Sequence, residues 1–126
     1  MSPITTHVLD TARGRPAVGL PVVLERAAGG RWETLGRGTT DADGRLRSLL
    51  PAPAAGQAPA TILPAGQYRL TFDTGAYFAT LGVRAFYASV PIQFVVEAYA
   101  TDAREVPHYH VPLLLSPFGY STYRGT

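Results

Sequence analysis

Apolar and polar residues alternate with a period of two along most of the chain, whereas the helical period is scarce. Runs of this kind indicate half-buried β-strands, and clusters of Gly, Pro and Asp separate them about every 8–12 residues. Eight strands are predicted, over residues 4–9, 20–26, 32–40, 45–49, 67–73, 90–99, 109–115 and 118–124. Many short strands with regular turns are typical of an all-β fold, so the pattern predicts a two-sheet antiparallel β-sandwich.

Three segments depart from the alternation. Residues 74–82 have large apolar side chains at helical spacing, and Thr74 can cap the first turn, so one short helix is predicted there. Residues 10–16 are rich in turn-forming residues. Residues 51–66 hold four prolines and are rich in alanine, which predicts a long loop within a single domain of residues 1–126 and not a linker.

The alternation also decides which face of each strand the histidines occupy. In the first strand His7 shares a face with Thr5, opposite the aliphatic side chains. In the seventh strand His110 shares a face with His108, again opposite the aliphatic side chains. If the aliphatic faces form the core, His7 and His110 point outward, where they are exposed unless a neighbouring subunit covers them. The parity therefore predicts a site on an outer sheet face that oligomerisation closes.

The composition excludes several classes of function. All eleven basic residues are Arg and Lys is absent, which excludes lysine Schiff-base chemistry and favours planar recognition of anions. The net charge is only +2 and the arginines are scattered, so nucleic acid is not an expected partner. Cysteine is absent as well, which excludes disulfides, thiolate nucleophiles and cysteine-ligated metals.

No apolar stretch of the sequence approaches the ~18 residues that a membrane-spanning helix needs. The first residues also lack the basic segment and apolar run of a signal peptide. We therefore expect a cytoplasmic protein that does not bind membranes, and a periplasmic location stays open if a leader was removed.

The three histidines are the strongest candidates for acid–base chemistry. A neutral imidazole titrates near pH 6.5 and can accept a proton from water at physiological pH. A lone strand histidine such as His7 more often makes an ordinary surface hydrogen bond, and His108 with His110 is equally compatible with a solvent-facing pair. A His-x-His pair plus a distant histidine is a known zinc geometry, but only Glu105 is near as a helper carboxylate, so no metal is predicted.

Arg45 follows a predicted tight turn at Asp43 and Gly44. An arginine at such a position is usually solvated, but it can also hold an anionic heterocycle or stabilise a developing oxyanion. Arg124 has the same two interpretations, and Tyr123 is either aromatic packing or a hydroxyl that orients a substrate. No GxSxG motif or phosphate-binding loop occurs, so a serine hydrolase is not expected.

Four sequence motifs together resemble the transthyretin-related family of 5-hydroxyisourate hydrolases, over nearly the whole chain. They are THVLD followed by GRPA near the start, TDADGR in the middle, FDTGAYF, and HYHVPLLLSPFGYSTYRGT at residues 108–126. The last motif is the most specific, because a tail of Tyr-Arg-Gly followed by Ser or Thr separates these enzymes from transthyretin itself. The middle motifs are weaker, since a turn like TDADGR also occurs in other prealbumin-like sandwich modules.

The resemblance implies an enzyme of urate degradation that hydrolyses 5-hydroxyisourate to 2-oxo-4-hydroxy-4-carboxy-5-ureidoimidazoline without a cofactor. It also implies a homotetramer, a dimer of dimers whose active sites lie at the dimer–dimer interface. Carried over residue by residue, the catalytic residues fall on His7, Arg45 and His110, and the substrate-binding tail falls on Tyr123, Arg124, Gly125 and Thr126. Thr126 departs from the Ser of many members, although a hydroxyl is retained.

Two other classes of function stay open at this point. One is a transthyretin-like carrier that binds a small aromatic ligand in the same channel without chemistry. The other is a structural sandwich module, which the first half of the chain alone would support. The paired histidines and the polar tail argue against both, because aliphatic residues would serve simple apolar binding better.

Overall fold

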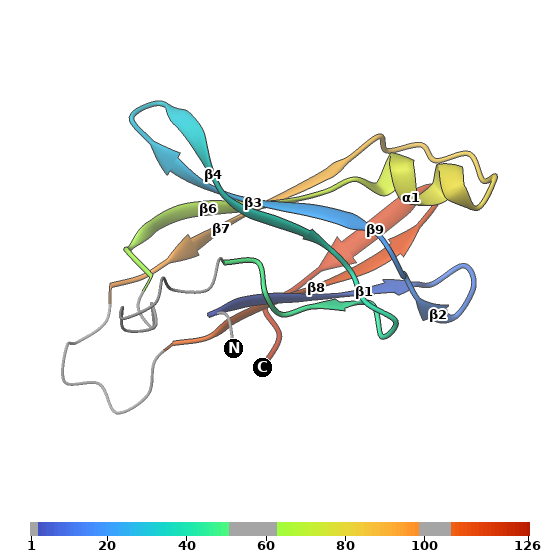
Figure 1. Ribbon diagram of the computed structural model, residues 1–126, viewed down its shortest axis with the longest axis horizontal. Coiled ribbons are helices and arrows are strands. Elements are labelled where there is room, and N and C mark those ends of the chain that lie inside the picture. Colours follow the sequence, from blue (N-terminus) through green and yellow to red (C-terminus); the bar gives the residue numbers. More distant parts are fainter. Residues whose placement is uncertain (1–2, 51–62, 99–106) are drawn as a thin grey trace.

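The computed structural model describes residues 3–50, 63–98 and 107–126, in which two β-sheets pack face to face with one short helix at one end (Figure 1). The first sheet has the order β2-β1-β8-β9, with β5 also paired to β1. Its strands are β1 (Ile4–Asp10), β2 (Arg15–Pro16), β5 (Arg45–Leu46), β8 (Tyr109–Ser116) and β9 (Gly119–Thr122). The second sheet has the order β4-β3-β6-β7. Its strands are β3 (Pro21–Ala28), β4 (Arg31–Thr39), β6 (Gly66–Phe72) and β7 (Val90–Val96). The predicted β-sandwich is confirmed.

Side chains from the inner faces of both sheets form the core. On β6, Tyr68, Leu70 and Phe72 alternate inward and are fully buried. On β1, Ile4 and Val8 are fully buried in the opposite sheet. Burial of each side chain of this size contributes about 1.5–3 kcal/mol. A shift of the strand register by one residue would turn a whole inner face toward solvent, so the register is strongly specified.

The observed strands differ from the predicted ones mainly at their ends. Part of the predicted turn over residues 10–16 is the short strand β2, which pairs with the end of β1. Only the first two residues of the predicted strand over residues 45–49 pair with β1. They form β5 and lie opposite His7 and Thr6. Most of the predicted 51–66 loop, and the end of the predicted 90–99 strand, lie outside the described residues.

The sheets are antiparallel, as predicted, except for one pair of strands. β1 and β8 come from opposite ends of the chain, yet they lie side by side and run parallel, with Ile4 opposite Tyr109 and Asp10 opposite Leu115 (Figure 1). The other strand pairs among the described residues are antiparallel. Alternation alone predicts which face a residue occupies but not the direction of its partner strand.

The helix α1 (Thr74–Thr80) begins after Asp73, whose carboxylate accepts a 3.0 Å hydrogen bond from the amide of Ala76. The prediction of Thr74 as the cap is therefore wrong. Thr74 is buried, and its hydroxyl donates to the carbonyl of Tyr87 at 2.9 Å. Aspartate one position earlier is the stronger cap because its carboxylate reaches a free amide of the first turn. In the described part of the chain no helix is long and apolar enough to cross a membrane.

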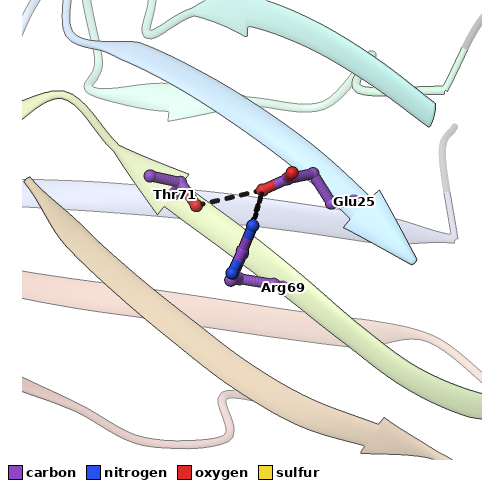
Figure 2. A network of polar contacts seen from close by, with 3 residues as sticks. All are labelled: Glu25, Arg69 and Thr71. Atoms are coloured by element: carbon purple, nitrogen blue, oxygen red, sulfur yellow. Dashed lines mark hydrogen bonds and ion pairs between the residues drawn. The ribbon is translucent and has the colours of Figure 1, made fainter. Parts of the chain in front are cut away.

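A polar network holds β3 and β6 together on the outer face of the second sheet (Figure 2). Nε of Arg69 donates to the carboxylate of Glu25 at 2.9 Å, and the hydroxyl of Thr71 donates to the same oxygen at 3.3 Å. The guanidinium of Arg69 also lies over the ring of Trp32, 4.2 Å from its centroid. These charged groups pair with one another, so the network fits a role in fixing strand register.

Candidate active site

Backbone pairing brings the predicted catalytic residues onto the outer face of the first sheet. His7 on β1 lies opposite Arg45 on β5, and Thr5 on β1 lies opposite His110 on β8. His7 and His110 therefore stand on adjacent strands, two residues apart in register. Both are half-buried, while the residues before and after each of them are buried, as strand parity predicts.

The turn before β5 fixes the position of Arg45 next to β1. The carboxylate of Asp41 accepts hydrogen bonds from the amides of Asp43 and Arg45, at 2.9 and 3.0 Å. These bonds hold the pKa of Asp41 below its usual value, and the bond from Arg45 has the larger effect. Gly44 has a φ of +74°, and a Cβ atom there would lie 2.5 Å from the carbonyl oxygen of Val8. Glycine is therefore the residue that fits this turn against β1.

A cleft of about 180 Å³ opens where β1, the segment from β5 to Arg47, β8 and the C-terminal residues meet. Its lining combines imidazoles, guanidiniums and hydroxyls, contributed by Thr5, Thr6, Arg45, Arg47, His108, His110 and Thr126. Groups of these types can accept a proton, stabilise an oxyanion and hydrogen-bond a polar ring. The cleft is thus suited to acid–base chemistry on a small polar molecule.

His110 has the most clearly defined environment among the imidazoles of the cleft. The hydroxyl of Thr5 lies 2.9 Å from Nδ1 of His110, which leaves Nε2 for the cleft. Burial lowers the pKa of His110 below its ordinary value of 6.5. The nearby charges of His108, Arg45 and His7 lower this pKa further. At physiological pH the ring is therefore neutral and able to accept a proton.

The C-terminal residues pass close beside His110. The amide of Gly125 donates a 2.8 Å hydrogen bond to the carbonyl of His110. A Cβ atom at position 125 would lie 2.6 Å from Cδ2 of the His110 ring and 3.1 Å from Cγ of Pro112. A side chain at this position would push against the imidazole, so glycine allows the close approach.

Tyr123 and Arg124 lie in a second hollow of about 150 Å³, which His110 also lines. The other side chains of this hollow are mostly apolar and come from β7 and β8. The guanidinium of Arg124 lies over the ring of Tyr109, 4.7 Å from its centroid. The four predicted tail residues are therefore divided: Thr126 lines the polar cleft, Tyr123 and Arg124 lie in the apolar hollow, and Gly125 lies beside the ring of His110.

Three residues that line the cleft are missing from the sequence prediction, namely Thr5, Thr6 and Arg47. Thr5 shares the predicted outward face with His7, and Arg47 follows Arg45 by two residues. Strand parity is therefore a usable signal for both. His7 lies beside Arg45 but does not itself line the cleft.

The rings of His108 and His110 lie 6.4 Å apart between centroids, with an angle of 20° between their planes. Thr5 contacts both of them. Among the residues that the structure describes, no three His, Asp or Glu side chains form a group that could hold a metal ion. The pair is thus organised around a shared hydroxyl.

Comparison with known proteins points to one family. Residues 4–125 match the family model described as HIUase/Transthyretin family. The 5-hydroxyisourate hydrolase 2 of Rhizobium meliloti is 46% identical, over 98% of this chain and 95% of that protein. The solved 5-hydroxyisourate hydrolase of Klebsiella pneumoniae is 39% identical with a TM-score of 0.76, over 100% of this chain and 94% of that one. Transthyretin from Sparus aurata is 30% identical with a TM-score of 0.82, over 99% of this chain and 97% of that one. The likeness extends over nearly the full length in each case, and the chain belongs to the HIUase/Transthyretin family.

Proposed function

We propose that the protein hydrolyses 5-hydroxyisourate to 2-oxo-4-hydroxy-4-carboxy-5-ureidoimidazoline in urate degradation. The observation that carries this proposal is the cleft that joins His110, with its lowered pKa, to the guanidinium of Arg45. Relatives named 5-hydroxyisourate hydrolase, in bacteria and in the mouse, support the same activity. The proposal requires no cofactor, because the reaction needs only water, proton transfer and orientation.

In this mechanism water attacks C6 of the six-membered ring and the N1–C6 bond breaks. His110, with His7 two residues away in register on the adjacent strand, takes a proton from the attacking water and later gives one to the leaving nitrogen. Arg45 stabilises the negative charge that develops on the carbonyl oxygen. Thr126, the tail residue that lines the cleft, helps to hold the ring of the substrate. General acid–base catalysis of this kind contributes about 10²–10⁴ in rate.

A transthyretin-like carrier is the competing function, since the fold is shared by both kinds of protein. The lining of the cleft favours the enzyme. Binding of an aromatic ligand without chemistry is served by apolar walls, whereas this cleft presents two imidazoles and two guanidiniums.

Freshly prepared 5-hydroxyisourate separates these functions in one assay. Loss of its ultraviolet absorbance should be much faster with the protein than in buffer, and a chelator should leave the accelerated rate unchanged. Equal rates with and without protein would contradict the proposed function and favour the carrier. Loss of the acceleration with the chelator would contradict the metal-free mechanism.

We further propose that the protein is a homotetramer with its active sites at the dimer–dimer interface. The cleft opens on an outer sheet face, where a neighbouring subunit could cover it. Large apolar side chains are exposed on the same sheet and after it: Phe118 between β8 and β9 is 68% exposed, and Tyr123 after β9 is 58% exposed. Among the described residues β7 and β9 are edge strands of their sheets, and Val95 on β7 is 60% exposed. Such surfaces are typical of subunit contacts.

Multi-angle light scattering is expected to give a mass about four times that of the 13.5 kDa chain, because the apolar edges need partners. The same samples should be assayed at the protein concentrations used for scattering. A fully active species with the mass of a single chain would contradict a site that is completed by neighbouring subunits.

Replacement of Gly125 by Ala is expected to reduce turnover by about tenfold to a hundredfold, because the added methyl group displaces the His110 ring. The urea unfolding midpoint should change little, since the tail is held there by one backbone hydrogen bond. Gly119→Ala is the matched control, because a Cβ atom there lies 3.7 Å from its nearest neighbour, Oγ of Ser116. Equal turnover in both variants would show that the approach of Gly125 to the imidazole is unimportant.

A further inference from the structure

The hydroxyl of Thr5 lies between two imidazoles. Its oxygen is 2.9 Å from Nδ1 of His110 and 3.1 Å from Nε2 of His108. Thr5 is only 4% exposed, so water has little access to take over these hydrogen bonds. One side chain from the start of β1 thus connects two rings that belong to the other end of the chain.

A threonine hydroxyl carries a single proton, so it can donate to only one of the two rings and accepts from the other. When it donates to His108, it accepts Nδ1–H of His110, and Nε2 of His110 is an unprotonated base. When it donates to His110, Nε2 of His110 carries the proton and can donate it. The tautomers of the two rings are therefore coupled through one oxygen atom.

We propose that Thr5 is a positioning residue that relays protons between His110 and His108 during hydrolysis of 5-hydroxyisourate, an inference that rests on the proposed function. Water bonds to C6 and gives a proton to Nε2 of His110. The Nδ1 proton of His110 passes to Thr5, and the Thr5 proton passes to Nε2 of His108. When the N1–C6 bond breaks, the Nε2 proton of His110 moves to N1 and the relay runs back. The enzyme thus ends the cycle with the protons it had at the start.

The charges around His110 explain why a relay is favourable. They are His7 on β1, Arg45 and Arg47 at and after β5, His108 on the same segment as His110, and Arg124 in the tail. All of these groups are basic, so a lasting positive charge on the partly buried His110 is unfavourable. Within the single subunit His108 is exposed and His110 is half-buried, so a positive charge loses less solvation on His108 than on His110. The relay moves the charge to the ring that accommodates it better.

Nitrogen-15 spectra of the imidazoles test the relay without any substrate. Thr5→Val removes the hydroxyl and nearly keeps the shape of the side chain, and the chain has only three histidines to assign. We expect the tautomer ratios of both His108 and His110 to change in Thr5→Val and to return toward wild type in Thr5→Ser. Unchanged shifts of both rings in Thr5→Val would overturn the proposal. Thr5→Ala serves the same comparison if the valine variant does not fold.

Kinetics with 5-hydroxyisourate test the catalytic consequence. In Thr5→Val we expect kcat to fall on the order of tenfold and KM to change little, with most of the loss restored in Thr5→Ser. The acid limb of the pH profile of kcat/KM should move to lower pH in Thr5→Val, because charged His110 loses a hydrogen-bond acceptor. Either result alone, an unchanged kcat or an unchanged acid limb, would overturn the relay. If the wild type does not accelerate hydrolysis at all, the proposed function is wrong. The nitrogen-15 comparison still tests whether Thr5 couples the tautomers of His108 and His110.

Thr11→Val is the matched control at the far end of β1, because Thr11 lines neither hollow. The hydroxyl of Thr11 donates to the carbonyl of Leu115 at 3.1 Å, which ties the residue after β1 to β8. We expect this variant to unfold at lower urea concentration while the imidazole shifts and the acid limb stay in place. Equal changes of the shifts in Thr5→Val and Thr11→Val would mean a general structural effect and would overturn the relay.

Discussion

Replacement of His110 by Asn is expected to reduce the turnover of 5-hydroxyisourate by about 10²–10⁴. Asparagine keeps a polar side chain at this position of β8, but its amide cannot take up a proton from water. The pKa of His110 is lowered first by burial, so the wild-type ring is neutral at physiological pH and its loss removes the proposed base. Rapid-mixing absorbance measurements on fresh substrate would record the change.

Glu33→Gln is a suitable control for this variant, because Glu33 is exposed on β4 in the other sheet. It should keep wild-type turnover, and both variants should keep the wild-type mass in light scattering. Wild-type turnover in His110→Asn, with the assembly intact, would remove His110 from the mechanism.

Replacement of Gly36 by Ala is expected to destabilise the fold by about 3 kcal/mol. A Cβ atom at position 36 would collide with the carbonyl oxygen of Leu49, which belongs to the backbone and cannot rotate away. Leu49 is itself buried in the core, so the segment that follows β5 would have to move. Urea unfolding at a fixed protein concentration measures the loss.

Gly38→Ala is the matched control on the same strand. A Cβ atom there would lie 3.0 Å from Cδ1 of Leu46, which is the end of a flexible side chain. The expected loss is under about 1 kcal/mol. Equal losses in the two variants would show that the approach of Gly36 to the backbone of Leu49 does not limit stability.

The face of the sheet that carries the site is predictable from the sequence. Alternation has a period of two, so the buried neighbours of His7 and His110 on β1 and β8 force both histidines outward. The tight turn before Arg45 is also predictable from the sequence, because Asp41 and Gly44 are the residue types that such a turn requires.

The contacts within the cleft are not predictable in the same way, because they depend on how the strands pair. Parallel pairing of β1 with β8 puts Thr5 opposite His110, and an antiparallel partner would have placed a different residue there. The division of the C-terminal residues between two hollows likewise depends on the bridge from Gly125 to His110. Local residue patterns carry no information on either contact.

A crystal structure with bound uric acid would test the position of the active site most directly, because this stable oxopurine lacks the hydroxyl group that makes the substrate ring labile. We expect its six-membered ring in the polar cleft, with a carbonyl oxygen near the guanidinium of Arg45 and the ring within hydrogen-bond distance of Nε2 of His110. Uric acid bound only in the apolar hollow beside Tyr123, away from Arg45, would contradict the assignment.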